Sequence, residues 1–90
     1  MNLAERMAEK TRRRAILSQL FFASGQALTA RALRDELENV HGQVATVDKI
    51  RAELLWLADV SLVQLAGDMA TLTERGRDVV MDRAVMPGET

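Results

Sequence analysis

The sequence predicts a mainly α-helical fold with one small β-hairpin, which is an α+β class. Two observations predict it. Apolar residues recur at helical spacing in three segments of the first 58 residues. After these segments, Gly67-Asp68 separates two short apolar runs of β-favouring residues. A two-residue loop of this kind is typical of a tight hairpin, because such turns need a positive φ, which Gly adopts without steric cost.

The composition fits one small domain. Ninety residues, 48% of them hydrophobic, are enough to fill one modest core without metals or disulfides. The chain has no cysteine, which suits the reducing cytoplasm, and its most apolar stretch, AILSQLFFA, is too short to span a bilayer. We therefore expect a cytoplasmic protein with no membrane partner.

The first helix is predicted from Asn2 or Leu3 to Ser24-Gly25, since Asn is a good N-cap and Gly is common just past a helix end. Its first half carries only Leu3 and Met7 as large apolar residues, and these have little to bury in a monomer. Its second half supplies the expected core residues Ile16, Leu17, Leu20 and Phe21.

The second helix should start after the N-cap Thr29 and end at Gly42. The preceding segment, residues 27–29, could add a strand of one or two residues to the hairpin. The expected core residues of this helix are Ala30, Leu33, Leu37 and Val40, and the ion pairs Arg31–Asp35 and Arg34–Glu38 are expected on its outer face.

The third helix should follow a turn at 42–45 and run over 47–58, with Thr46 as its N-cap. At about 100° per residue, one arc of this helix gathers apolar residues that must face the core. These are Val47, Ile50, Leu54 and Leu57.

The hairpin and a last helix complete the domain. Thr73 caps a helix predicted over 74–84, which Pro87-Gly88 cannot extend. The inner face of the hairpin is expected to carry Val63, Leu65, Ala70 and Leu72, and its outer face Gln64 and Thr71. The last helix is expected to pack against the body through Val79, Val80 and Arg83.

This order of elements favours a winged helix-turn-helix, with a three-helix core, a two-stranded wing and a C-terminal helix. We expect the winged-helix domain to span residues 13–84. Residues 1–12 would form an N-terminal helical extension, and residues 85–90 a flexible tail.

The segment LADVSLVQLAGDMATLTERGRDVV resembles the hairpin-and-last-helix signature of winged-helix bacterial regulators. In that signature a Leu-Val pair opens the second strand and Leu-Thr-x-x-Gly closes the third. The corresponding residues here are Leu62, Val63, Leu72, Thr73 and Gly76, whereas Ser61 stands where a Gly often precedes the pair. The whole chain also resembles small winged-helix proteins of Mu-like phages and prophages, often labelled regulators of the arsenic-repressor type.

The resemblance implies sequence-specific DNA binding by the third helix, often as a dimer. Gln43 and Thr46 offer hydrogen bonds there, Lys49 can contact phosphate or guanine, and Arg51 can contact the DNA backbone. The net charge is −1, and the wing carries an acid at its turn and no base from residue 60 to 73, so local patches must supply the attraction.

The densest positive charge is the KTRRR run at residues 10–14. A solvated helix face and a phosphate-binding patch are both open interpretations of it. The candidate phosphate contacts in this run are Lys10, Arg12 and Arg13.

A protein interface is the alternative use of the surface. Leu55 and Trp56 would leave an apolar patch on the third helix unless something covers it. Trp56 packs either within its own chain, against the N-terminal extension or the base of the hairpin, or against a partner. Leu3 and Met7 of the extension are the other candidate interface residues.

No catalytic, metal or cofactor site is expected. His41 is the single histidine and lies at the end of the second helix, where a cation suits the helix dipole. The cysteines of metal-sensing regulators are missing, and the five glycines form no phosphate-binding loop.

Two hypotheses follow. The first is a homodimeric regulator of transcription, from a phage, prophage or bacterium, that binds double-stranded DNA. The second is a winged-helix module that binds another protein and binds DNA weakly or not at all. Neither is an enzyme.

Overall fold

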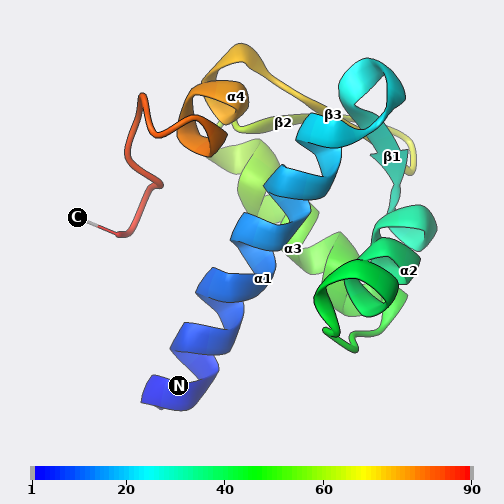
Figure 1. The fold of residues 1–90 in the computed structure, drawn as a ribbon, viewed down its shortest axis with the longest axis vertical. Coiled ribbons are helices and arrows are strands. Elements are labelled where there is room, and N and C mark those ends of the chain that lie inside the picture. The colour runs from blue at the N-terminus through cyan, green and yellow to red at the C-terminus, as the bar shows by residue number, and fades with distance from the viewer. Residues whose placement is uncertain (1, 90) are drawn as a thin grey trace.

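The computed structural model describes residues 2–89, which form four α-helices and one three-stranded antiparallel sheet (Figure 1). This α+β arrangement is the predicted class and is compatible with the expected order of elements. The helices are α1 (Leu3–Phe22), α2 (Ala30–His41), α3 (Val47–Asp59) and α4 (Glu74–Val80), the strands are β1 (Ala27–Thr29), β2 (Val63–Ala66) and β3 (Met69–Leu72), and a 3₁₀ turn, η1, covers Ser24–Gln26.

Every helix begins at a side-chain cap, as the sequence predicted. In each case the side-chain oxygen of the cap accepts a hydrogen bond from the backbone N–H three residues later, which satisfies a donor that the helix itself cannot pair. The cap and donor residues are Asn2 with Glu5, Thr29 with Ala32, Thr46 with Lys49, and Thr73 with Gly76.

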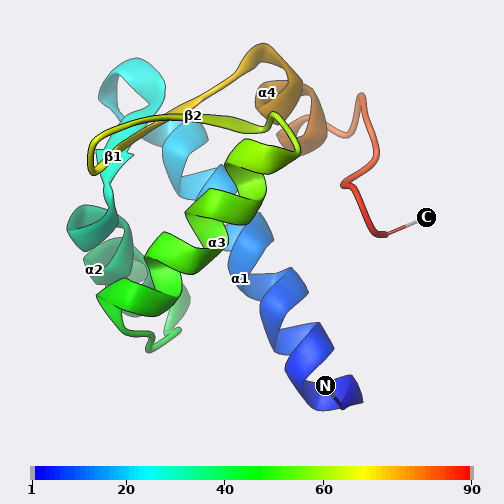
Figure 2. The same cartoon turned by 180° about the vertical axis from the view of Figure 1, so that it is seen from behind.

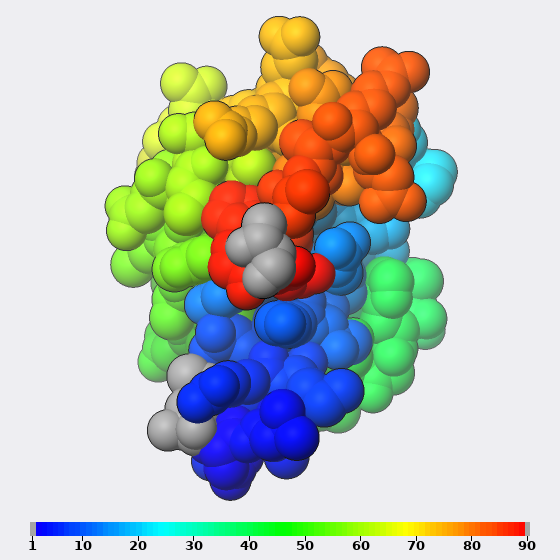
Figure 3. Space-filling model, turned by 90° about the vertical axis from the view of Figure 1, so that its left-hand side faces the viewer, coloured from blue at the N-terminus to red at the C-terminus, as the bar shows by residue number. Residues whose placement is uncertain are grey.

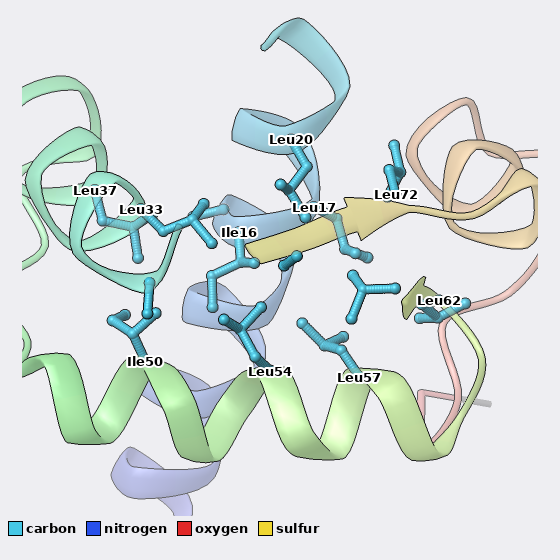
Figure 4. Close-up of a cluster of buried hydrophobic side chains, with 14 of the residues drawn as sticks. Ile16, Leu17, Leu20, Leu33, Leu37, Ile50, Leu54, Leu57, Leu62 and Leu72 are labelled. Carbon is cyan, nitrogen blue, oxygen red and sulfur yellow. The ribbon is translucent and has the colours of Figure 1, made fainter. Parts of the chain in front are cut away.

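The core lies where α1, α2 and α3 meet beneath the sheet. Figure 4 shows their apolar side chains pointing toward one another, with Leu62 and Leu72 closing one side. Val40 was expected in this core, but the prediction is wrong. It lies 61% exposed in the last turn of α2, where the chain turns toward α3. The buried residues contributed by the three helices are Ala15, Ile16, Leu17, Leu20, Ala30, Leu33, Leu37, Ile50, Leu54 and Leu57.

The expected i,i+4 ion pairs of α2 do not form. Arg34 instead pairs with its neighbour Asp35, at 2.9 Å from Nη2 to Oδ1. Arg31 and Glu38 make no ion pair with any residue in the range 2–89. Arg31, in the first turn of α2, is therefore a cation without an ion pair in the described range.

The hairpin is confirmed, and β1 extends it into a sheet of order β1-β3-β2. Gly67 has φ 60° at the turn, as the tight loop requires. Val63 pairs with Leu72 and Leu65 with Ala70, so these four side chains share the inner face as predicted. Strand β1 is three residues long rather than one or two.

The base of the hairpin packs closely against α4. The Thr73 N–H donates to the Leu62 carbonyl at 3.1 Å, and the Thr73 hydroxyl donates to the Ser61 carbonyl at 2.7 Å. A Cβ on Gly76 would overlap the Leu62 carbonyl oxygen and lie 2.6 Å from Leu72 Cδ1. Helix α4 can approach the hairpin this closely because position 76 has no side chain.

Ser61 adopts a left-handed conformation, with φ 66°. Gly reaches positive φ without steric cost, so the Gly expected here from the sequence resemblance would suit this backbone conformation. Here a Ser adopts it.

Helix α4 is shorter than predicted. It ends at Val80 rather than at residue 84, and Asp82 has φ 58°, which no α-helix can accommodate. Val79 is buried as expected, but Arg83 is exposed rather than packed against the body.

Residues 85–90 were expected to form a flexible tail, and in the structure residues 86 and 89 of this segment contact the body. Met86 is buried, and Glu89 accepts two hydrogen bonds from Arg14, at 3.1 and 2.8 Å. Figure 3 shows residues 85–89, in red, lying between α1 in blue and α3 in yellow-green. Residue 90, part of the predicted tail, lies outside the described residues.

Gly76→Ala should destabilise the fold by about 2 kcal/mol, because the added methyl overpacks a rigid backbone contact. An ordinary Gly→Ala change in a helix has the opposite sign, with a gain of about 0.5–1 kcal/mol. Urea unfolding followed by circular dichroism measures the difference. The control is Arg75→Ala, at an exposed neighbour, which should change stability by less than about 0.5 kcal/mol. A neutral or stabilising Gly76→Ala would contradict the close packing.

Candidate functional site

Helix α3 presents one exposed face beside the hairpin. In Figure 2 it lies in front of α1, with the hairpin above it and α2 at its start. The buried side of this helix carries Ile50, Leu54 and Leu57. Lys49 and Arg51 lie outside this buried arc and are exposed to solvent. The structure therefore places two of the residues predicted for DNA recognition, Lys49 and Arg51, on an accessible surface.

The start of α3 is held by Thr46. Its hydroxyl oxygen accepts a hydrogen bond from the Lys49 backbone N–H at 3.0 Å, so one role of this side chain is to cap the helix. The Lys49 side chain makes no ion pair with residues 2–89, although Glu5 and Glu9 of α1 line the same surface hollow. Gln43 is half-buried in the turn before the helix.

Arg51 is held by acids on two sides. Its Nε lies 3.0 Å from Asp68 Oδ1 and its Nη2 lies 3.4 Å from Asp68 Oδ2, at the tip of the hairpin. Its Nη1 lies 3.5 Å from Asp48. The acidic tip of the hairpin is thus turned toward α3.

The pKa of Asp68 lies below its ordinary value, because Arg51 donates hydrogen bonds to the carboxylate and adds its positive charge. The same hydrogen bonds raise the pKa of Arg51. A carboxyl group whose pKa is lowered by folding contributes stability above its unfolded pKa and loses that contribution as the pH falls through its folded pKa. The Asp68 carboxylate is therefore charged at neutral pH, and any contribution of the ion pair to stability is lost as the pH falls into the acid range.

Arg31 is a residue of this surface that the sequence prediction missed. It lies exposed in the first turn of α2, and its charge adds to the lowering of the pKa of Asp68 after the effects of Arg51. The Ala30 N–H donates to the Asp68 carbonyl at 3.2 Å, which holds the start of α2 against the hairpin tip. The expected pairing of residues 27–29 with the hairpin could have revealed this proximity.

Arg12 and Arg13 bind an acid inside the protein. Arg12 Nη1 lies 3.2 Å from Glu53 Oε2, and Arg13 Nε lies 3.4 Å from Glu53 Oε1. Arg13 also pairs with Glu9 at 2.9 Å. The two arginine side chains are only 18% and 16% exposed. In the folded chain they join α1 to α3 and offer little surface to a phosphate.

Glu53 was missed as the partner of these arginines, although the sequence contained a signal. At helical spacing it falls at the edge of the apolar arc of α3, beside Leu57, where a lone acid needs a buried partner. It is 5% exposed. Arg13 Nε is too poorly aligned for a hydrogen bond and has no such partner among residues 2–89, so this contact is ionic.

Trp56 packs within its own chain, which was one of the two alternatives. The Arg13 guanidinium lies over its ring, 3.7 Å from the centroid. A desolvated cation–π contact of this kind can be worth about 2 kcal/mol. Met86 and Pro87 line the same hollow as Trp56 and Arg13, so the C-terminal segment helps to cover this aromatic residue.

The KTRRR run is thus largely engaged in the structure. Arg14 pairs with Glu89, and their hydrogen bond raises the pKa of Arg14. Lys10 is exposed and makes no ion pair within the described part of the chain. Of the three cations that the sequence singled out for phosphate contact, Lys10 is the accessible one.

Three of the predicted interface residues are exposed apolar side chains. Leu3 is 72% exposed, Met7 59% and Leu55 61%. Leu3 and Met7 lie one turn apart on α1, in the part of the helix that extends beyond the body (Figure 2). Leu55 lines a shallow hollow between α3 and the hairpin.

Within residues 2–89, no group of three or more histidine or acidic side chains is arranged to hold a metal ion. None of the helices in this range is both long enough and apolar enough to cross a membrane.

Glu53→Gln should destabilise the protein by about 1–2 kcal/mol, because it removes the charge that two poorly exposed arginines share. Urea unfolding provides the measurement. Glu38→Gln, an exposed acid on α2 without an ion pair, is the matched control and should change stability by less than about 0.5 kcal/mol. Equal effects of the two changes would show that the Glu53 cluster does not hold α1 to α3.

Comparison with known proteins identifies no relative of the chain, because no family model, no curated protein and no solved structure matches it.

Proposed function

We propose that this protein is a winged helix-turn-helix protein that binds double-stranded DNA through α3. The observation that carries the proposal is a set of three exposed cations on α2 and α3. Arg31 and Arg51 lie beside Asp68 at the hairpin tip, and Lys49 lies on the flank of α3 that faces α1. Two of them come from α3 and one from the first turn of α2, so they lie on two helices that flank one turn.

The fold assignment within this proposal is the winged helix. Helices α2 and α3, joined by residues 42–46, act as the helix-turn-helix, and β2 and β3 form the wing. The sheet order β1-β3-β2 and the capped α4 after the wing support this assignment. The second helix of such a motif is the one that enters the major groove.

The proposed contacts follow from side-chain chemistry. Lys49 binds phosphate or a guanine edge, and Arg31 binds phosphate beside the groove. Exposed Ala52 is small enough to allow α3 to approach the bases closely. Gln43 and the Thr46 hydroxyl supply hydrogen bonds from the turn at the start of the helix.

The proposed phosphate surface differs from the KTRRR run. Arg12 and Arg13 would have to leave Glu53 to reach DNA, and that would uncover a buried acid. Lys10 is retained as a peripheral contact because its charge is unpaired within residues 2–89. With so few free cations, we expect weak binding to random DNA and a role in regulating transcription, as the sequence resemblance implies.

A labelled random-sequence duplex should bind measurably at about 50 mM salt and much more weakly at about 200 mM, because phosphate contacts release counterions. Lys49→Ala and Arg31→Ala should each weaken binding and lower the salt slope by about 0.9 per lost contact. Fluorescence anisotropy at several salt concentrations measures both quantities.

Arg83→Ala is the matched control for these two variants. Arg83 is also exposed and unpaired in the described range, but it follows α4 and lies outside the α2–α3 surface. Its removal should leave affinity and slope unchanged. Absence of binding at about 50 mM salt, where phosphate attraction is strong, would rule out DNA binding.

A second candidate function is protein interaction through the N-terminal part of α1, starting with a second copy of the chain. Leu3 and Met7 are exposed on one face of a helix whose side toward α3 carries the charged Glu9, Arg12 and Arg13. An apolar face on the outside of a protruding helix suits contact with another helix.

If α1 mediates dimerisation, the unaltered protein should have the mass of a dimer in sedimentation equilibrium, and Leu3→Gln with Met7→Gln should convert it to a monomer. Val85→Gln, at a residue that is 63% exposed near the other end of the chain, controls for a general loss of surface apolarity and should leave the dimer intact. A dimer that survives the double change, or a monomeric unaltered chain, would exclude this role.

A further inference from the structure

Arg51 and Asp68 form a paired contact across the surface proposed to meet DNA. Two nitrogens of the guanidinium, Nε and Nη2, face the two oxygens of one carboxylate at 3.0 and 3.4 Å. This forked arrangement is the one by which arginine also binds a phosphate group or the edge of a guanine. Asp68 therefore occupies one of the two edges of Arg51 that can bind such a group, and the Nη1 atom of the other edge lies 3.5 Å from Asp48.

The position of Asp68 is fixed by the backbone around it. Its carbonyl accepts a hydrogen bond from the Ala30 N–H, and its neighbours Gly67 and Met69 are set by the turn and by the β3 pairing with β1. Met69 pairs with Thr29, the residue that caps α2. The hairpin tip is thus attached to α2, and the carboxylate is presented toward α3.

The three cations of the surface differ in what holds them. Lys49 and Arg31 make no ion pair with residues 2–89, whereas Arg51 is bracketed by Asp68 and Asp48. A phosphate that takes the Nε and Nη2 atoms of Arg51 must displace Asp68, and it then lies close to the freed carboxylate. Both effects oppose binding that depends on phosphate attraction alone.

We propose that Asp68 is an intramolecular competitor for Arg51, which lowers the affinity of the protein for DNA of arbitrary sequence. This inference rests on the proposed DNA-binding function. It assigns the acidic wing tip a role within that function: Arg51 becomes available only when the duplex offers contacts that outweigh the carboxylate.

The test is a mutant cycle of Asp68→Asn and Arg51→Ala with a random-sequence duplex at about 50 mM salt. Asp68→Asn preserves a residue suited to turns and removes the charge. It should tighten binding about threefold to tenfold in the unaltered background and steepen the salt slope by about 0.9, as one released cation would. In the Arg51→Ala background the gain should fall to less than about twofold, since no competition remains.

Two further variants complete the design. Asp59→Asn removes an exposed acid of α3 that makes no ion pair in the described chain, and it should change affinity less than Asp68→Asn does. Asp68→Ser repeats the loss of charge with another turn residue and guards against an effect specific to the Asn amide.

The outcomes separate the two proposals. An equal gain from Asp68→Asn with and without Arg51 would mean that Asp68 acts only through its own repulsion of DNA, which overturns the competition. No gain in a protein that binds through Lys49 and Arg31 would overturn the inference and leave the proposed function standing. Absence of binding by both the unaltered protein and Asp68→Asn would overturn both.

Discussion

The backbone at Ser61 and Leu62 is the constraint on which the arrangement of α3, the hairpin and α4 depends. At the end of α3, the Ser61 N–H donates to the Ala58 carbonyl at 3.0 Å and the Leu62 N–H donates to the Leu57 carbonyl at 2.9 Å. The carbonyls of Ser61 and Leu62 in turn accept the hydrogen bonds from Thr73, where β3 passes into α4. Gly76 allows α4 to pack directly on the Leu62 carbonyl. Four elements, α3, β2, β3 and α4, therefore meet at the backbone of residues 61 and 62. The angle at which the hairpin leaves α3, and hence where its tip lies, follows from this junction.

Much of the fold could be predicted because its signals are local. A capping oxygen and a Gly at a turn act within three or four residues, and Asn2, Thr29, Thr46, Thr73 and Gly67 all behave as their chemistry indicates. The wrong predictions concern which turns of a helix are packed against the rest of the protein and where a helix ends. Val40 lies on the apolar side of α2 but beyond the packed part. Helix α4 ends at Val80, shortly before Asp82 adopts a left-handed φ, and an Asp alone does not mark where such a turn occurs. Helical periodicity defines a face and does not say how far a neighbour covers it.

The candidate site was predictable in part for the same reason. The exposure of Lys49 and Arg51 follows from the apolar arc of α3, which is a local pattern. Their electrostatic environment does not, because Glu53 meets Arg12 across 41 residues and Asp68 meets Arg51 across 17. A chain whose acids and bases nearly balance uses many of its charges on one another, so the unpaired cations, rather than the cationic runs, indicate where an anion can bind.

The stacking of Arg13 on Trp56 has a practical consequence. Trp56 is the single tryptophan of the chain, and its ring lies where α1, α3 and the C-terminal segment meet. Its fluorescence therefore reports on one defined junction, without interference from any other indole. Movement of α1 or of the C-terminal segment away from the body would change the solvation of this ring, so intrinsic emission can follow the local opening of that junction separately from the global unfolding that circular dichroism records.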